Sequence, residues 1–287
     1  MSLERPTVVD KNIENNPEKI WKRKDKSSKR LITALEVFTK VAVREVKVDG
    51  LEHVLEIPSD RKVVIAVSHA SDLDLPLAAG LLSKYFDVII TNQSIQYKFS
   101  QDMGSNVGMK VLGTGNFLPI DWELPASGKP RKFNPENFKP MADAMQDGRS
   151  IIIAGHQPSH QGVVERSGYG AVYLSEITNA VVLPVGVDVK SDEGTKVGMS
   201  DHKIKTLLQR PAADIKIGPS FELQHIEGLD RLAEIIEKRK KGVTIDKQEL
   251  QEFDSLKEQL KIQSRILIDK IVELMPSEKQ PKEENHE

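Results

Sequence analysis

Short runs of β-branched apolar residues alternate with segments of helical periodicity along most of this chain, and that alternation is the strongest constraint on its fold. Strand character is found in residues 45–48, 62–67, 87–91, 117–120, 150–154, 181–187 and 214–217. Helical patterns lie between them at residues 73–84, 136–146 and 168–178. Such alternation predicts an α/β fold with a mostly parallel central sheet flanked by helices on both faces. In that architecture, functional sites form at the carboxyl ends of the strands.

The chain divides into five predicted segments. They are a flexible leader (1–18), a basic amphipathic helical segment (19–45), the α/β domain (46–225), a C-terminal helical extension (226–276) and a disordered tail (277–287). In the extension, residues 246–275 have the pattern of a long helix, with Asp246 and Glu249 spaced as a capping box. Pro276 is expected to end that helix.

The segment at 19–45 has two interpretations. It carries seven Lys or Arg residues between positions 19 and 30, together with Trp21, and then an amphipathic helical pattern. Such a helix can lie on an anionic lipid surface, or it can pack on the domain with a solvated basic face. The longest uncharged apolar stretch, near 177–187, is shorter than the ~20 residues of a spanning helix. With no signal-peptide pattern at the start, the expected location is cytoplasmic, peripherally associated with the inner face of a membrane.

Composition excludes several classes of function. The formal net charge of -2 offers no global attraction to nucleic acid, so no nucleic-acid partner is expected. The absence of cysteine excludes disulfides, thiolate nucleophiles and sulfur-ligated metals. With 38% hydrophobic and 29% charged residues, the chain has the composition of a globular protein.

The segment KVVIAVSHASDLDLPLAAGLLSKY carries the most chemistry. A buried strand is expected to end at Val67, so His69 falls on the following turn and Asp74 in the first turn of the next helix. That spacing can pair an imidazole base with a carboxylate that orients it. The structural alternative makes Ser71 a helix N-cap that Asp74 reciprocates, with His69 an incidental loop residue.

Six blocks in this order resemble the glycerolipid acyltransferase family typified by lysophosphatidic acid acyltransferase. They are SHASDLD, which stands where the family has Asn-His-x-Ser-x-x-Asp, then GTGNFLPID, DGRSIIIAGHQPSHQG, NAVVLPVGV, ADIKIGPSFEL and IVELMPSEKQP. The resemblance covers approximately residues 46–276, and its specificity comes from the order and spacing of the blocks. It implies an acyltransferase in which His69 deprotonates an acceptor hydroxyl and Asp74 orients His69. The hydroxyl oxygen then attacks the acyl thioester without an acyl-enzyme.

The family resemblance also implies the partners. The donor is acyl-CoA or an acyl carrier protein, and the acceptor is a glycerol-phosphate or a lysophospholipid. No cofactor or metal is expected. Backbone N–H groups near the helix start would stabilise the oxyanion.

Two blocks depart from the family pattern. The third reads Ala-Gly-His-Gln-Pro-Ser from Ala154 onward where the family has Phe-Pro-Glu-Gly-Thr-Arg, and Trp122 replaces the arginine that ends the second. A phosphate needs at least one guanidinium or several donors. The expected substrate-binding residues are therefore Arg166, which precedes a helix start, with Gly155, His156, Ser71, Lys129 and Arg131.

Two other functions remain open. The altered blocks suit a lipid-binding family member without turnover. His156 and His160 form His-x-x-x-His, and with His69, Asp72 and Asp74 they suggest a metal-dependent hydrolase. Pro158 argues against a helix that would bring both histidines onto one face.

Overall fold

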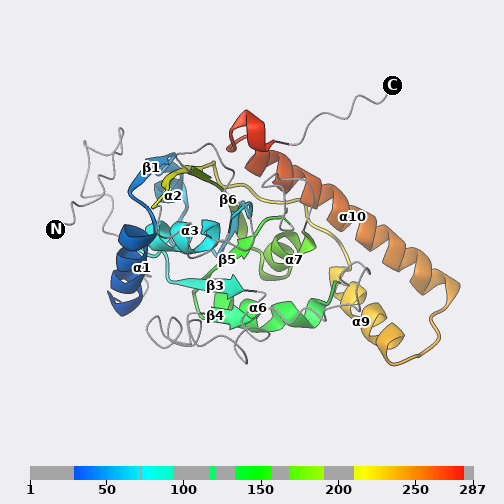
Figure 1. The fold of residues 1–287 in the computed structure, drawn as a ribbon. Helices are drawn as coiled ribbons and strands as arrows, with labels where there is room; N and C mark the ends of the chain where they lie inside the picture. The colour runs from blue at the N-terminus through cyan, green and yellow to red at the C-terminus, as the bar shows by residue number, and fades with distance from the viewer. Residues whose placement is uncertain are drawn as a thin grey trace, which may run out of the picture.

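A computed structural model of the chain describes residues 29–71, 73–92, 117–119, 133–156, 168–190 and 210–280. Its strands are β1 (Glu45–Asp49), β2 (Val63–Val67), β3 (Val88–Asn92), β4 (Phe117–Pro119), β5 (Ser150–Ala154), β6 (Val181–Lys190) and β7 (Ala212–Ile217). They form one sheet in the order β1-β7-β6-β2-β5-β3-β4. Only the β6–β7 pair within it is antiparallel (Figure 1). All seven predicted strands and the mostly parallel sheet are therefore confirmed.

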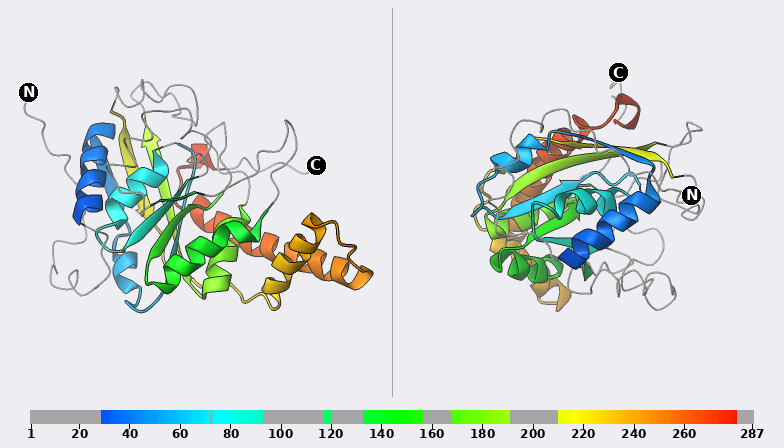
Figure 2. Two further views of the ribbon diagram at one scale, coloured as in Figure 1. Left: turned by 90° about the horizontal axis from the view of Figure 1, so that it is seen from below. Right: turned by 90° about the vertical axis from the view of Figure 1, so that its left-hand side faces the viewer.

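Helices cover both faces of this sheet, as predicted. They are α1 (Lys29–Ala42), α2 (Glu52–Glu56), α3 (Asp74–Leu82), α6 (Lys139–Gln146), α7 (Tyr169–Thr178), α9 (Leu229–Lys240) and α10 (Lys247–Val272), with 3-10 turns η3 (Pro135–Phe138) and η4 (Ser277–Lys279). Figure 2 shows α1 and α3 on one side of the sheet and α6, α7 and α10 on the other. Each face buries its own apolar cluster.

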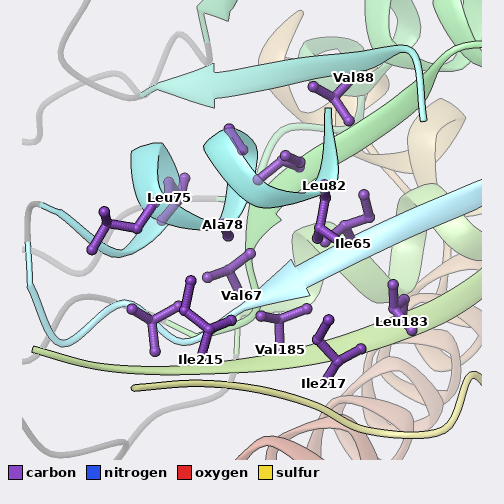
Figure 3. Close-up of a cluster of buried hydrophobic side chains, with 14 of the residues drawn as sticks. Ile65, Val67, Leu75, Ala78, Leu82, Val88, Leu183, Val185, Ile215 and Ile217 are labelled. Carbon is purple, nitrogen blue, oxygen red and sulfur yellow. The ribbon is translucent and has the colours of Figure 1, made fainter. Parts of the chain in front are cut away.

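Strand β2 lies in the middle of the sheet and is buried on both faces. All five of its residues are inaccessible to solvent, so the run Val-Val-Ile-Ala-Val has no polar side. Ile65 and Val67 pack with Leu75, Ala78 and Leu82 of the α3 segment on one face (Figure 3). Such a continuous apolar run is typical of a parallel strand covered on both sides.

Helix α1 packs along α3 with one apolar side. Leu31 and Leu35 are buried there, and Gly80 lets the two helices approach closely, since a Cβ at that position would lie 2.6 Å from Thr39 Oγ1. Val37 and Val41 are exposed. In the described residues, no helix combines the length and apolarity needed to cross a membrane.

The C-terminal helix α10 begins with the predicted capping box. Asp246 accepts a hydrogen bond from the Glu249 backbone, and Glu249 accepts one from the Asp246 backbone. The predicted start of the disordered tail at residue 277 is wrong. Residues 277–280 instead form η4 and a return turn, because Gln280 Nε2 donates to the carbonyls of Val272 and Met275. The leader (1–18), residues 19–28 and residues 281–287 lie outside the described residues.

Gly50 closes the turn after β1, and we expect its replacement by alanine to destabilise the fold. Its φ is +80°, and an added Cβ would lie 2.0 Å from the Ile217 carbonyl oxygen, so the variant suffers both backbone strain and a clash with main chain. The expected loss in the free energy of unfolding is about 2–4 kcal/mol for Gly50→Ala. Gly148→Ala is the matched control, because φ there is +88° but nothing lies within 4 Å. It should lose only about 1 kcal/mol. Equal losses in urea unfolding would contradict the clash.

Candidate active site

The candidate site lies where β2 and β5 end side by side. In this parallel pair Val67 is the register partner of Ala154, and Gly155 N–H donates to the Val67 carbonyl at 2.8 Å. The residues that follow the two strands, 68–71 and 155–156, therefore share one edge of the sheet. We call these two segments the carboxyl edge. The sequence predicted a functional site at the carboxyl ends of the strands.

His69 and His156 are in contact at the carboxyl edge. The His69 backbone N–H donates to His156 Nε2 at 2.7 Å, and the His156 side chain is buried with 2% exposure. Because Nε2 accepts here, the hydrogen-bond geometry assigns a neutral imidazole with its proton on Nδ1. His69 itself is only partly buried, although its Nδ1 is inaccessible to solvent.

Asp74 is fully buried at the start of α3 and closes the turn with one oxygen. Its Oδ2 accepts from the N–H groups of Ala70 at 2.7 Å and Ser71 at 2.8 Å. Ser71 Oγ in turn accepts from Leu73 N–H at 3.1 Å. The bond from Ser71 N–H to Asp74 is one that the structural interpretation predicts, but Leu73, not Ser71, is the N-cap of α3, and its side chain makes no capping hydrogen bond. Asp74 therefore has a role in holding the turn whatever its role in chemistry.

The second oxygen of Asp74 has a different environment. Asp74 Oδ1 is buried and has no hydrogen-bond partner within the part of the chain that the structure describes. The hydrogen bond between His69 and Asp74 that the motif predicts is not formed in this conformation, and the pairing stays a prediction. A buried oxygen without a partner is costly, so this atom is available to a donor that approaches it.

Burial changes the acidity of this carboxyl group. Desolvation raises the pKa of Asp74 from 3.8 to about 8. The backbone N–H of Ser71, the Lys279 ammonium and the Ala70 N–H oppose this rise, whereas Asp188 adds to it. The ionisation of Asp74 is therefore balanced near neutral pH.

Lys279 and Asp188, which the sequence reasoning missed, form a buried ion pair near this carboxylate. Their side chains are 7% and 9% exposed. Asp188 is the charged residue in an otherwise apolar stretch of β6, and that was the available signal. Lys279 was missed because residues 277–287 were predicted to be a disordered tail.

Gly155 lies beneath α10. A Cβ at this position would lie 2.3 Å from Ile271 Cδ1, so the absent side chain makes room for that helix. This contact explains Gly155 by packing, and its predicted contact with substrate stays a prediction. Arg166, Lys129, Arg131, Asp72 and His160 lie outside the described residues.

Comparisons with known proteins find a likeness in structure. No protein-family model matches the sequence, and no curated protein matches it. The chain is similar to a solved structure, the 1-acyl-sn-glycerophosphate (LPA) acyltransferase PlsC from Thermotoga maritima. The TM-score is 0.43, with 16% identity over 74% of this chain and 77% of that chain.

Among the described residues, no group of three or more His, Asp or Glu side chains is placed to hold a metal ion. His69, His156 and Asp74 nevertheless meet at one edge, and each has a distinct contact: a backbone N–H, an imidazole acceptor and a carboxylate. This arrangement can move a proton between a hydroxyl group and an imidazole.

Replacing Asp74 should change how stability depends on pH. The raised pKa means that the folded protein keeps a proton that the unfolded chain releases, so this contribution is complete below about pH 4 and is lost as the pH rises through about 8. Asp74→Asn keeps an oxygen for the N–H groups of Ala70 and Ser71 but cannot ionise. The free energy of unfolding of the wild type, relative to Asp74→Asn, should therefore fall between about pH 4 and about pH 8. Urea unfolding measures it, and a constant difference would refute the raised pKa.

His156 should be needed as a hydrogen-bond acceptor. His156→Leu leaves the His69 N–H without its partner, at an expected cost of about 1–3 kcal/mol in the free energy of unfolding. His156→Gln is the matched variant, because an amide oxygen can reach the position of Nε2, and it should lose less. If both variants unfold at the same urea concentration, the contact does not stabilise the turn.

Proposed function

We propose that this protein is an acyltransferase that moves a fatty acyl group from a thioester donor to the hydroxyl of a glycerol-phosphate or lysophospholipid. One observation carries the proposal. His69, partly exposed at the end of the central strand, is followed within the same turn by the buried carboxylate of Asp74, one oxygen of which holds the turn while the other has no partner among the described residues. An imidazole base near a carboxylate oxygen that can stabilise its protonated form is suited to taking a proton from an alcohol.

The proposed reaction begins when His69 takes the proton of the acceptor hydroxyl. The alkoxide oxygen attacks the thioester carbonyl, the resulting tetrahedral intermediate expels the thiolate, and the imidazolium returns its proton to that sulfur. Asp74 Oδ1 stabilises the imidazolium once Nδ1–H turns toward it. The N–H groups of His69, Ala70 and Ser71 already bind protein acceptors, so we assign the oxyanion to other donors.

The acceptor phosphate needs cations, and the proposed ones are Arg166, Lys129 and Arg131. Lys279, the cation whose charge acts on Asp74, is already paired with Asp188 and is buried. His156 is proposed to act on the acceptor side through His69, whose backbone N–H its Nε2 accepts, because the ring itself is buried. Both substrates, the thioester of coenzyme A or acyl carrier protein and the acceptor, would meet at this edge.

A membrane surface is the proposed place of action. Val37 and Val41 are 54% and 60% exposed on α1, one helical turn apart, on a helix that follows the basic residues 19–28. Exposed apolar side chains beside a basic segment favour contact with anionic lipid. The inner face of a membrane would supply lysolipid acceptors.

The decisive test incubates the protein with labelled acyl-CoA and, separately, labelled acyl carrier protein, each with glycerol 3-phosphate and a set of lysolipids. We expect an acylated product, and His69→Ala should lower the rate at least about 100-fold because the base is lost. His225→Ala is the control, since His225 is an exposed histidine paired with Glu176, and it should keep the wild-type rate. Thermal unfolding should show both variants folded.

Two results would contradict the proposal. Full acyl transfer by a folded His69→Ala variant would remove His69 as the base. Tight binding of lysolipid by the wild type, with no product from either donor, would instead identify a lipid-binding protein without turnover.

A further inference from the structure

The end of the chain returns to the candidate site through a buried lysine. Lys279 lies in η4, directly after α10, and its ammonium is paired with Asp188 on β6 and lies 3.4 Å from the Val189 carbonyl. Figure 1 shows η4 at the end of α10, near the β6 side of the sheet. Burying an ion pair costs desolvation free energy. A polar segment near the end of a chain is therefore not expected to bury a lysine unless the charge has a function there.

This ion pair is joined to the carboxyl edge by a short chain of contacts. Asp188 follows Val187, whose N–H donates to Ser68 Oγ at 2.8 Å, and Ser68 Oγ is also 3.4 Å from the Val187 carbonyl. Ser68 is the residue before His69. Asp188 is therefore next in sequence to a residue that is hydrogen-bonded to the turn that carries the proposed base.

Contacts at the end of α10 fix the position of Lys279 next to Asp188. Gly186 on β6 lets the end of the helix approach, since a Cβ there would lie 2.8 Å from Leu274 Cβ. Gln280 then folds the tail back onto the end of α10 through its two hydrogen bonds to main-chain carbonyls. The position of the ammonium thus depends on main-chain packing at both ends of η4.

The charges around Asp74 come from several elements. Lys279 of η4 attracts a negative carboxylate, whereas Asp188 of β6 repels it, and His69 and His156 are the titratable groups on the carboxyl edge itself. Asp188 also lies 3.6 Å from the exposed Lys190, which is paired with Asp214. Without Lys279, Asp188 would still have Lys190 as a partner on the solvent side. Asp74 would lose the buried positive charge that opposes the rise of its pKa.

We propose that Lys279 is a positioning residue, held by Asp188, whose ammonium favours the carboxylate form of Asp74 against its burial, in the turn that carries His69. This inference rests on the proposed function for its catalytic consequence, but the charge effect on Asp74 can be measured without substrate. Lys279 touches no reacting atom. It acts through Asp74, and it would set the pH range in which His69 works as a base.

Two substitutions should act in opposite directions. Lys279→Met removes the attracting charge, so the pH at which Asp74 ionises should rise by about one unit or more. Asp188→Asn removes the repelling charge, so it should fall. If acyl transfer occurs, the acidic limb of kcat/KM should move the same way, with Lys279→Met losing about 10-fold near pH 7 and recovering at high pH.

The experiment is a pH titration of the intact protein carrying 13C-labelled aspartate carboxyls, in which Asp74→Asn identifies the Asp74 signal. Lys279→Arg should keep the wild-type midpoint. Lys270→Met, an exposed lysine of α10 paired with Glu273, is the control for losing any charge from this region. The double variant Asp188→Asn with Lys279→Met covers poor folding of either single variant, and its midpoint should lie between theirs.

Opposite shifts of the Asp74 midpoint support the proposal. Shifts of the same sign, or an unchanged midpoint in variants that only unfold more easily, would overturn it and leave Lys279 as a tether for the tail. If the midpoints move in opposite directions while the wild type transfers no acyl group, the proposed function fails and the electrostatic coupling still stands.

Discussion

The structure depends on the hydrogen bonding of β2 between β5 and β6. That pairing makes β2 a central strand with no solvent side, which only an apolar sequence can satisfy. It also fixes where the chain must leave the sheet. Because β2 and β5 run parallel and end in register, the turn at His69 and the turn at His156 emerge at one edge, and the contact between them follows from the topology.

The turn after β2 buries one carboxyl group, that of Asp74, and desolvation disfavours its charged form. Asp74 receives two backbone hydrogen bonds on one oxygen, and these bonds together with the Lys279 ammonium offset part of the desolvation of its charge, whereas Asp188 adds to the cost of ionisation. A site that needs a carboxylate near neutral pH cannot rely on the turn alone. Structural and chemical interpretations of Asp74 are therefore compatible, since its two oxygens have different surroundings.

Much of the fold was predictable because it depends on local pattern. All seven strands were found near their predicted bounds, and the capping box at Asp246 was identified from spacing alone. Helices α2 and α9 were not assigned separately, since short or strongly charged segments carry a weak periodic signal. The position of His69 and Asp74 on one turn was also local. The position of Lys279 next to Asp188 was not predictable. It depends on contacts of Gly155 and Gly186 with Ile271 and Leu274, which are far away in the sequence, and the polar composition of the last residues gives no sign of them.

A histidine rather than a carboxylate at position 156 has an electrostatic consequence. A carboxylate at this buried position would place a second negative charge at the carboxyl edge, in addition to Asp74 and close to Asp188, and like charges in a desolvated site oppose ionisation. A neutral imidazole accepts the His69 N–H without adding that charge. The described cation nearby, Lys279, is matched by Asp188 and is not left for a phosphate. Under the proposed function, an anionic acceptor would thus need cations from outside the described residues, while the carboxyl edge would serve the proton transfer.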